Sequence, residues 1–316
     1  MGRVFVVGSF NVDHVWRCDA LPSPGQTLAG SYGSGPGGKG FNQAMAARRA
    51  GAGAVFVCAL GSDAGGQLAR ALANADDIDL RALTSKEPTG TAGIYVDARG
   101  RNCIVIGAGA NAALSADAAR AHLHDLDDGD VLLVQAETPI ATVQAVLAQA
   151  RERGALAILN PAPANAEVDA ATLALCDIAT PNETEFCALL ARAGIQPPSA
   201  DAVAGLDDVL LHGLCRRLLP QASVVLTLGA AGCFVSHAPS LQREDAQASY
   251  RVPAPAARVV DTTGAGDAFN GALAASLALG AGRAFAAHVV SANHYAARST
   301  ESAGAALAMP RLQVAY

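Results

Sequence analysis

The chain has 316 residues, of which 51% are hydrophobic and 16% are charged, so it can bury a large core and is not a disordered protein. Its net charge of −6 argues against nucleic acid and anionic membranes as main partners. We expect a soluble cytoplasmic protein, because the N-terminus lacks a signal peptide and no apolar run reaches the roughly eighteen residues of a membrane helix.

Short apolar runs alternate with alanine-rich stretches along most of the chain. The apolar runs predict buried strands and the alanine-rich stretches predict helices, an alternation that favours a mostly parallel sheet with helices on both faces. The predicted strands cover residues 4–7, 55–58, 131–134, 157–159, 177–179 and 224–228. The predicted helices include residues 42–50, 66–74, 116–124, 140–153 and 267–279.

Two segments interrupt this alternation. Residues 15–32 predict an extended stretch with a turn near Pro24, and residues 91–106 predict a hairpin. Both alternate in hydrophobicity more than the central strands do, which indicates that one face is in water. We therefore predict a small β lid, formed by about residues 12–35 and 91–107, on a single domain that spans residues 1–316.

Polar residues come directly after several of the predicted strands. Ligands of open parallel sheets bind beyond the carboxyl ends of the strands, so these residues predict a large cleft at that edge. They are Asn11, Asp13, Glu137, Asn160, Asn182, Glu185, Thr227 and Gly229.

A glycine-rich stretch at residues 33–40 matches two nucleotide-binding motifs only in part. It fits the dinucleotide fingerprint, but Pro36 interrupts the loop and no matching acid follows a second strand. It nearly fits a P-loop, but Gly40 stands where magnesium coordination needs Ser or Thr. The remaining motif, residues 37–44, predicts a loop that grips a polyhydroxylated ligand through close backbone approach and the amide of Asn42.

The most informative stretch covers residues 261–271, Asp-Thr-Thr-Gly-Ala-Gly-Asp-Ala-Phe-Asn-Gly. Its glycines and the free N–H groups of the helix that follows predict a nest for anions. A carboxylate beside that nest repels phosphate, so Asp267 is better suited to take a proton from a group that attacks the phosphate. The segment therefore predicts a phosphoryl-transfer site with Asp267 as its base.

Together these motifs resemble the ribokinase family, within the phosphofructokinase-B group of sugar kinases. The resemblance covers essentially the whole chain and rests on residues 8–13, 37–44, 109–112, 135–137, 160–164, 180–185, 227–229 and 261–273. It implies a three-layer α/β sandwich with a β lid. It also implies ATP-dependent phosphorylation of D-ribose at its 5-hydroxyl, with Mg²⁺ and with K⁺ as an activating cation.

The resemblance assigns roles to residues motif by motif. It implies that Asp267 is the base and that the backbone of Gly264, Ala265, Gly266 and Asp267 forms the anion hole. The sugar would be held by Asn11, Asp13, Gly38, Lys39, Asn42 and Glu137. ATP would be held by Asn182, Thr227, Gly229, Gly232, Gly266 and Asn293, with Glu185 organising Mg²⁺ through water. The K⁺ site would comprise Asp261, Thr263, Ser299, Ser302 and Gly304.

Four positions depart from the family pattern. Glu301 and Ser302 replace a threonine-arginine pair, and Ala308 replaces a serine ligand of K⁺. Phe41 stands where ribokinases often have alanine, and we expect it to reshape the loop near the sugar.

Because proteins similar to ribokinase often pair through the lid, and exposed strand edges favour pairing, we expect a homodimer.

Two other interpretations stay open. One is another sugar or nucleoside kinase of the same family, such as a fructokinase or an adenosine kinase-like enzyme, which would need a different lid and an apolar base pocket. The other is a non-catalytic sugar-binding protein on the same fold. The intact Asp267 and the intact glycines at 264 and 266 argue against it.

Overall fold

The larger of two β-sheets forms the centre of the protein, in a computed structural model that describes residues 2–239 and 241–312. Its nine strands lie in the order β13-β12-β11-β10-β9-β8-β1-β4-β5. All neighbours from β11 to β5 pair in parallel, whereas β12 and β13 extend one edge in antiparallel fashion. The strands are β1 (Arg3–Val7), β4 (Gly53–Leu60), β5 (Asp79–Thr84), β8 (Val131–Gln135), β9 (Leu156–Asn160), β10 (Ile178–Ala179), β11 (Ser223–Thr227), β12 (Cys233–Ser236) and β13 (Ser249–Val252).

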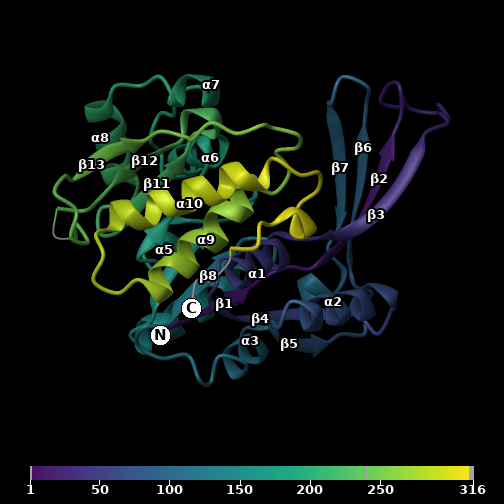
Figure 1. The fold of residues 1–316 in the computed structure, drawn as a ribbon, viewed down its shortest axis with the longest axis horizontal. Coiled ribbons are helices and arrows are strands. Elements are labelled where there is room, and N and C mark those ends of the chain that lie inside the picture. The colour runs from purple at the N-terminus through teal and green to yellow at the C-terminus, as the bar shows by residue number, and fades with distance from the viewer. Residues whose placement is uncertain (1, 240, 313–316) are drawn as a thin grey trace.

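Helices cover both faces of this sheet and bury two separate apolar clusters against it (Figure 1). Successive side chains of a strand point to opposite faces, so Phe5 and Val7 enter one cluster and Val4 and Val6 the other. One face carries α1 (Lys39–Arg49), α2 (Ala64–Ala75), α9 (Ala265–Leu279) and α10 (Phe285–Ser299). The other carries α3 (Ala116–Ala121), α4 (Ile140–Glu152), α5 (Ala170–Leu173), α6 (Glu183–Arg192), α7 (Ala200–Val203) and α8 (Asp208–Leu218).

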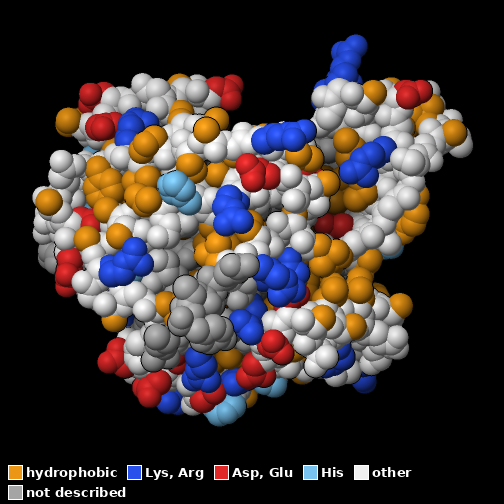
Figure 2. Space-filling model, in the orientation of Figure 1, with side chains coloured by type: hydrophobic (Ala, Val, Ile, Leu, Met, Phe, Trp, Pro, Cys, Tyr) orange, Lys and Arg blue, Asp and Glu red, His pale blue; other side chains and the backbone are white. Residues whose placement is uncertain are grey.

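The second sheet projects from this body as a lid and has the strand order β3-β2-β6-β7 (Figure 1). Figure 2 shows the surface hollowed between the lid and the body, with hydrophobic side chains along the lid. Trp16 stacks against Tyr32 and Tyr95, with ring centroids 5.2 Å apart in each pair, on the face of β2 opposite Asp13. The lid strands are β2 (Asn11–Arg17), β3 (Ser31–Gly37), β6 (Gly90–Val96) and β7 (Asn102–Gly107).

The predicted elements are confirmed in kind, with shifted ends. The helix predicted for residues 116–124 ends at Ala121, because the chain turns there and the carbonyl of His122 accepts a hydrogen bond of 2.8 Å from Arg81. Asn11 and Asp13, predicted to follow the first strand, lie inside β2. Several elements were not predicted: β5, β12, β13, the helices α5, α6, α7, α8 and α10, and three 3₁₀ turns, η1 (Gly109–Ala113), η2 (Gly229–Ala231) and η3 (Ala306–Ala308). In the described part of the chain, none of the helices is both long and apolar enough to span a bilayer.

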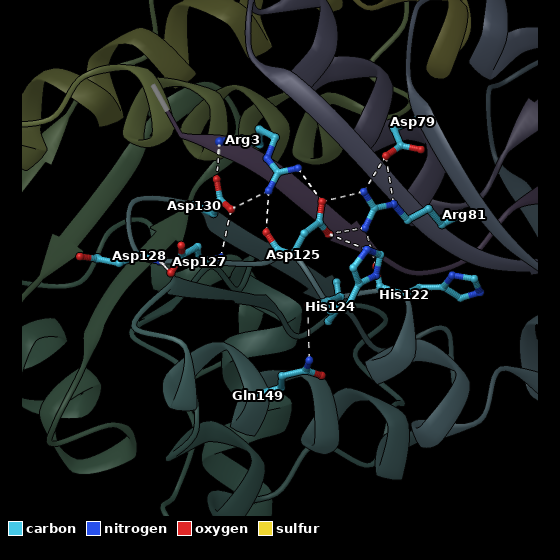
Figure 3. A network of polar contacts seen from close by, with 11 residues as sticks. Arg3, Asp79, Arg81, His122, His124, Asp125, Asp127, Asp128, Asp130 and Gln149 are labelled. Atoms are coloured by element: carbon cyan, nitrogen blue, oxygen red, sulfur yellow. Dashed lines mark hydrogen bonds and ion pairs between the residues drawn. The ribbon is translucent and has the colours of Figure 1, made fainter.

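A network of ion pairs joins β1 and β5 to the loop that precedes β8 (Figure 3). Arg3 donates to Asp125 at 2.8 Å, and Arg81 donates to both Asp125 and Asp79. Both guanidinium groups also lie over the ring of Phe5, at 4.7 and 5.7 Å. The hydrogen bonds from Arg81, followed by those from Arg3, hold the pKa of the Asp125 carboxyl well below its usual value.

We expect Asp125→Asn to lower the free energy of unfolding at pH 7 by about 1 kcal/mol, a value discounted because the pair is partly exposed and screened. A carboxyl whose pKa is lowered in the folded state stabilises the fold at pH values above its ordinary pKa of about 4. This contribution is lost as the pH falls through the lowered pKa. The difference between variant and wild type should therefore shrink in acid. Urea unfolding at pH 7 and pH 3 measures it, with the exposed Asp128→Asn as control. Equal free energies of unfolding of the two variants at pH 7 would show that the ion pairs of Asp125 do not stabilise the fold.

Candidate active site

A pocket of about 380 Å³ lies beyond the carboxyl ends of β9, β10 and β11, where the polar residues after the strands predicted a cleft. Its wall also includes the first turn of α9 and the middle of α10. Every residue predicted to bind the nucleotide lines this pocket: Asn182, Glu185, Thr227, Gly229, Gly232, Gly266 and Asn293. Lys39, Gly264, Ala265 and Asp267 line it too.

The first turn of α9 faces this pocket with its backbone N–H groups. Gly264 precedes the helix in the left-handed conformation, with a φ of 76°, which glycine adopts without strain. The N–H of Ala265 donates to the carbonyl of Thr262 at 3.1 Å. Gly266 and Asp267 lie at the second and third helical positions, where a helix has no carbonyl of its own to offer the N–H groups. These two groups are therefore suited to hold an anion.

Asp267 lines the pocket and is only 7% exposed. Its two oxygens accept hydrogen bonds from different amides. Asn42 Nδ2 donates to Oδ2 at 2.8 Å, and Gln43 Nε2 donates to Oδ1 at 2.9 Å. Burial raises the pKa of Asp267, although Lys39 and the two amides oppose that rise. A buried carboxylate that is held in one orientation is well suited to receive a proton.

Lys39, the first residue of α1, lies among three carboxylates. Burial alone would lower the pKa of Lys39, but Asp267, Glu137 and Glu185 outweigh it, and the pKa is raised. The lysine therefore stays cationic. A fixed positive charge here compensates the acids around it and also attracts a phosphate that enters the pocket.

The predicted sugar-binding residues lie on the lid side of Asp267. The carboxylate of Glu137 accepts from Ser9 Oγ at 2.5 Å and from the backbone N–H of Lys39 at 3.1 Å, both through Oε2. Burial first, then Glu137 and Asp267, raise the pKa of Asp13 to about 6. Both Glu137 and Asp267 are close enough to raise the pKa of Asp13, so the three acids make a compact acidic surface beside Lys39.

Two further features shape this side. Asn111 donates from Nδ2 to Asn11 Oδ1 at 2.9 Å and also holds both backbone groups of Phe10, which fixes the start of β2. Gly38 has a φ of 88°, and a Cβ on it would lie 2.8 Å from Asn11 N and from Ser9 O. Only glycine lets the loop before α1 approach β2 this closely.

The two loops predicted to bind K⁺ meet beside the first turn of α9. The carboxylate of Asp261 joins them, because Oδ1 accepts from the N–H and hydroxyl of Thr263 while Oδ2 accepts from the N–H of Gly304 at 2.9 Å. The hydroxyl of Ser299 donates to the carbonyl of Ala296 at 2.7 Å, so it is engaged within α10. Ser302 is exposed, as is its neighbour Glu301, and Ala308 lies in η3.

The side chain of Phe41, which we expect to reshape the loop near the sugar, lies in the core. Its ring is fully buried and packs between Phe10 and Phe56, with centroids 5.1 and 5.8 Å away. The ring therefore belongs to the core beneath α1, whereas the next two residues of that helix, Asn42 and Gln43, reach Asp267.

Three residues of the site lie in the predicted motifs, but no role was predicted for them. Ser9 supports Glu137, Asn111 supports Asn11, and Gln43 holds Asp267. Each lies in a predicted motif, and Ser9 and Gln43 are completely buried. A polar side chain inside an apolar element was the signal that could have found Gln43, since buried polar groups need partners.

Comparison with known proteins places this geometry among kinases. The model of the pfkB family of carbohydrate kinases matches residues 1–312. A ribokinase of Haemophilus influenzae is 36% identical over 275 residues, which cover 86% of this chain and 84% of that protein. A ribokinase of Mus musculus is 35% identical, with 97% and 91% covered. The structure of Arabidopsis thaliana ribokinase complexed with ribose and ATP superimposes with a TM-score of 0.78 at 28% identity and covers 98% of this chain and 96% of that one.

Proposed function

The chain belongs to the pfkB family of carbohydrate kinases, and on that basis we propose that it transfers the γ-phosphoryl group of ATP to the 5-hydroxyl of D-ribose. The observation that carries the proposal is the buried carboxylate of Asp267, which lies between the anion-binding turn of α9 and the acidic surface beneath the lid. We further propose that residues 1–316 act as one kinase domain, because the pocket draws residues from Lys39 to Ala296.

The sugar would lie between β2, the loop before α1 and Glu137. Asp13 and Glu137 would accept hydrogen bonds from ribose hydroxyls, and Asn11, Asn42 and the region of Gly38 and Lys39 would complete the pocket. The carboxylate of Asp267 takes the proton as the O–H bond of the 5-hydroxyl breaks. The oxygen forms a bond to the γ-phosphorus, and the bond from that phosphorus to the ADP oxygen breaks.

The nucleotide would occupy the pocket beyond β9 to β11. The N–H groups of the turn at residues 264–267 would stabilise charge on the transferring phosphoryl group, and most of the catalysis would come from positioning. Each oxygen of Glu185 accepts one hydrogen bond from Asn182, and an ionised carboxylate oxygen has a second lone pair. Glu185 therefore fits an indirect, water-mediated role toward Mg²⁺, which would shield the charge of the phosphates when bound.

We also propose that a monovalent cation binds between the loops joined by Asp261. The carboxylate and the backbone carbonyls of residues 261–263 and 299–304 are oxygen donors of the kind that K⁺ needs, and backbone donors are independent of the side chain at Ala308. Burial would raise the pKa of Asp261, but the hydroxyl of Thr263 and the N–H of Gly304 outweigh this and lower it, so the carboxylate is ionised at neutral pH.

Replacing K⁺ by Na⁺ should therefore lower the turnover of the wild-type enzyme, because the smaller ion fits the same oxygens less well. Asp261→Ala should lower the turnover in K⁺ and abolish most of the difference between the two ions. Initial rates in each chloride salt at constant ionic strength measure both effects. Identical rates of the wild type in K⁺ and Na⁺ would mean that the changes at Glu301, Ser302 and Ala308 have disabled the site.

The lid supports a further proposal, that two copies of the chain pair through it. Val105 is 65% exposed and Tyr32 56% exposed on the same face as the stacked Trp16. An exposed apolar face of this kind favours association. Sedimentation velocity should show a dimer for the wild type and a shift toward monomer for Val105→Glu. A wild type that sediments as a monomer at working concentration would contradict the proposal.

The experiment that tests the main proposal is ATP consumption with ribose, 2-deoxyribose, fructose and adenosine, with NAD⁺ as a control for redox chemistry. Ribose should give the highest kcat/KM, because the sugar side offers acids and amides for several hydroxyls. Fast turnover on adenosine alone would overturn the ribose assignment in favour of a nucleoside kinase. Binding of ribose without any ATP consumption would favour a non-catalytic sugar-binding protein.

A further inference from the structure

A chain of buried amide side chains runs beneath the site from the end of β8 to the start of α9. Gln135 donates to Gln43 Oε1 at 2.6 Å, and Gln43 Nε2 donates to Asn160 Oδ1 at 3.0 Å. Asn160 Nδ2 donates to the carbonyl of Thr180 at 3.0 Å. Thr180 Oγ1 donates to Asn270 Oδ1 at 2.5 Å. We call Gln135, Gln43, Asn160, Thr180 and Asn270 the amide relay; all are 6% exposed or less.

Backbone carbonyls determine which way two amides of this relay face, those of Asn270 and Asn160. The carbonyl of Gly266 accepts from Asn270 Nδ2 at 2.8 Å. A carbonyl only accepts, so Asn270 must present its nitrogen there and its oxygen to Thr180. The carbonyl of Thr180 likewise takes the nitrogen of Asn160, which leaves the oxygen of Asn160 to face Gln43.

The orientation of Gln43 then follows from both of its neighbours. Its nitrogen must face the oxygen of Asn160, and its oxygen accepts the N–H of Gln135. The same nitrogen donates to Asp267 Oδ1. A flipped Gln43 would place its oxygen against both a carboxylate oxygen and a carboxamide oxygen, which is repulsive. The relay therefore keeps an N–H on Oδ1 of Asp267.

The other oxygen of the base, Oδ2, is held differently. Its partner Asn42 has a buried Oδ1 without a hydrogen-bond partner among the described residues, so no comparable contact fixes that amide. Asn42 can rotate its amide and accept a hydrogen bond from a protonated Oδ2, whereas Gln43 cannot do so at Oδ1 without breaking the relay. The two oxygens of Asp267 are thus chemically distinct.

We propose that Gln43, held by Gln135, is a positioning residue that reserves Oδ1 of Asp267 as a permanent acceptor and directs the proton of the sugar hydroxyl to Oδ2. The inference rests on the proposed kinase function and adds to it a specific atom of the base. The far end of the relay acts on the same helix turn, because Asn270 fixes the carbonyl of Gly266 and with it the peptide that carries the N–H of Asp267.

Charged groups from several elements influence the pKa of Asp267, so the inference can be tested by pH. Lys39 of α1 lowers its pKa, and Glu137 after β8 raises it. Asp13 of β2 and Glu185 of α6 also interact with it. A hydrogen bond from Gln43 to the ionised form holds the pKa of Asp267 down. Its removal should raise that pKa and shift the acid limb of kcat to higher pH.

The test uses Gln43→Met and Gln135→Met, which keep the side-chain length and remove the hydrogen bonds. Gln149→Met is the matched control, because Gln149, like Gln135, is a buried glutamine whose oxygen has no hydrogen-bond partner within residues 2–239 and 241–312, but it lies in α4, remote from the site. For Gln43→Met we expect kcat to fall by about 10–100-fold and the acid limb to move up by about one pH unit, with KM for ribose within about threefold. Gln135→Met should give a smaller shift in the same direction.

The profile of kcat against pH, the KM for ribose and the thermal midpoint are measured for all four proteins. An upward shift of the acid limb in both relay variants and not in Gln149→Met supports the inference. If either Gln43→Met or Gln135→Met is folded and active with an unshifted limb, or if Gln149→Met shifts it equally, the inference is wrong. Failure of the proposed function looks different, since the wild type itself would then leave ribose unphosphorylated. If the wild type prefers another sugar, the same profiles are taken with that sugar, because the inference concerns the two oxygens of Asp267 and not the identity of the sugar.

Discussion

Asp267→Asn is expected to lower kcat by about 10²–10⁴-fold while ribose still binds. The substitution keeps the shape of the side chain but replaces one oxygen by an NH₂ group, so the residue can no longer accept the proton of the 5-hydroxyl. That NH₂ must also face Asn42 Nδ2 or Gln43 Nε2, both of which donate to the carboxylate in the wild type. Asn42 can turn its amide to relieve the conflict, whereas Gln43 is held by the relay.

Steady-state kinetics and ribose binding by calorimetry test this expectation. The exposed Asp128→Asn makes the same chemical change at the opposite end of the sheet and should leave kcat unaltered. If the variant retains more than about a tenth of the wild-type kcat, Asp267 is not the base, because general-base catalysis contributes at least about a hundredfold. Loss of ribose binding would instead point to a role for the carboxylate in holding the sugar.

Gly271→Ala is expected to disturb both stability and catalysis. Gly271 lies where α9 crosses α1, and a Cβ on it would lie 2.4 Å from the carbonyl oxygen of Gln43 and 2.5 Å from Ala46 Cβ. Backbone atoms cannot rotate away as a flexible side chain can, so the two helices must separate. We expect a loss of about 3 kcal/mol in the free energy of unfolding. Because α1 carries Asn42 and Gln43, and small misplacements of reacting groups are costly, kcat should fall by about tenfold or more.

Gly213→Ala is the matched control for that substitution. Gly213 lies in the middle of α8, and a Cβ on it would have no heavy atom within 4 Å. Alanine is the better helix former by about 1 kcal/mol, so this variant should be as stable as the wild type or slightly more stable, with unchanged kcat. Chemical unfolding and initial rates compare the two. A Gly271→Ala protein as stable and active as Gly213→Ala would show that the helix crossing can widen at no cost.

Local chemistry made the pocket at the start of α9 and the lid predictable from sequence. The Asp-Thr-Thr-Gly-Ala-Gly-Asp motif combines a left-handed glycine, orphan N–H groups and an acid within seven residues, and the structure places all of them on one pocket. The lid followed from alternation and turn residues, as the ends of β2, β3, β6 and β7 show.

Two kinds of feature could not be predicted: strands too short to show a period, and contacts between segments far apart in the sequence. The antiparallel strands β12 and β13 are four residues each, too short for a distinct period. The role of Gln43 depends on Asp267, 224 positions away, and becomes visible only when α1 packs on α9. The direction of Phe41 was missed for the same reason, because the rings of Phe10 and Phe56 that receive it come from other elements.

The order of the strands has a consequence for synthesis of the chain. Strands from the first 135 residues occupy one side of the large sheet, strands from residue 156 onward occupy the other, and every strand of both sheets ends by Val252. Asp267 and Asn293 come later, on helices that pack back across this framework. Asp267, the residue proposed to activate the sugar, therefore joins the site only after every one of these strands has been synthesised. ATP consumption would begin only once α9 and α10 have packed onto the sheet.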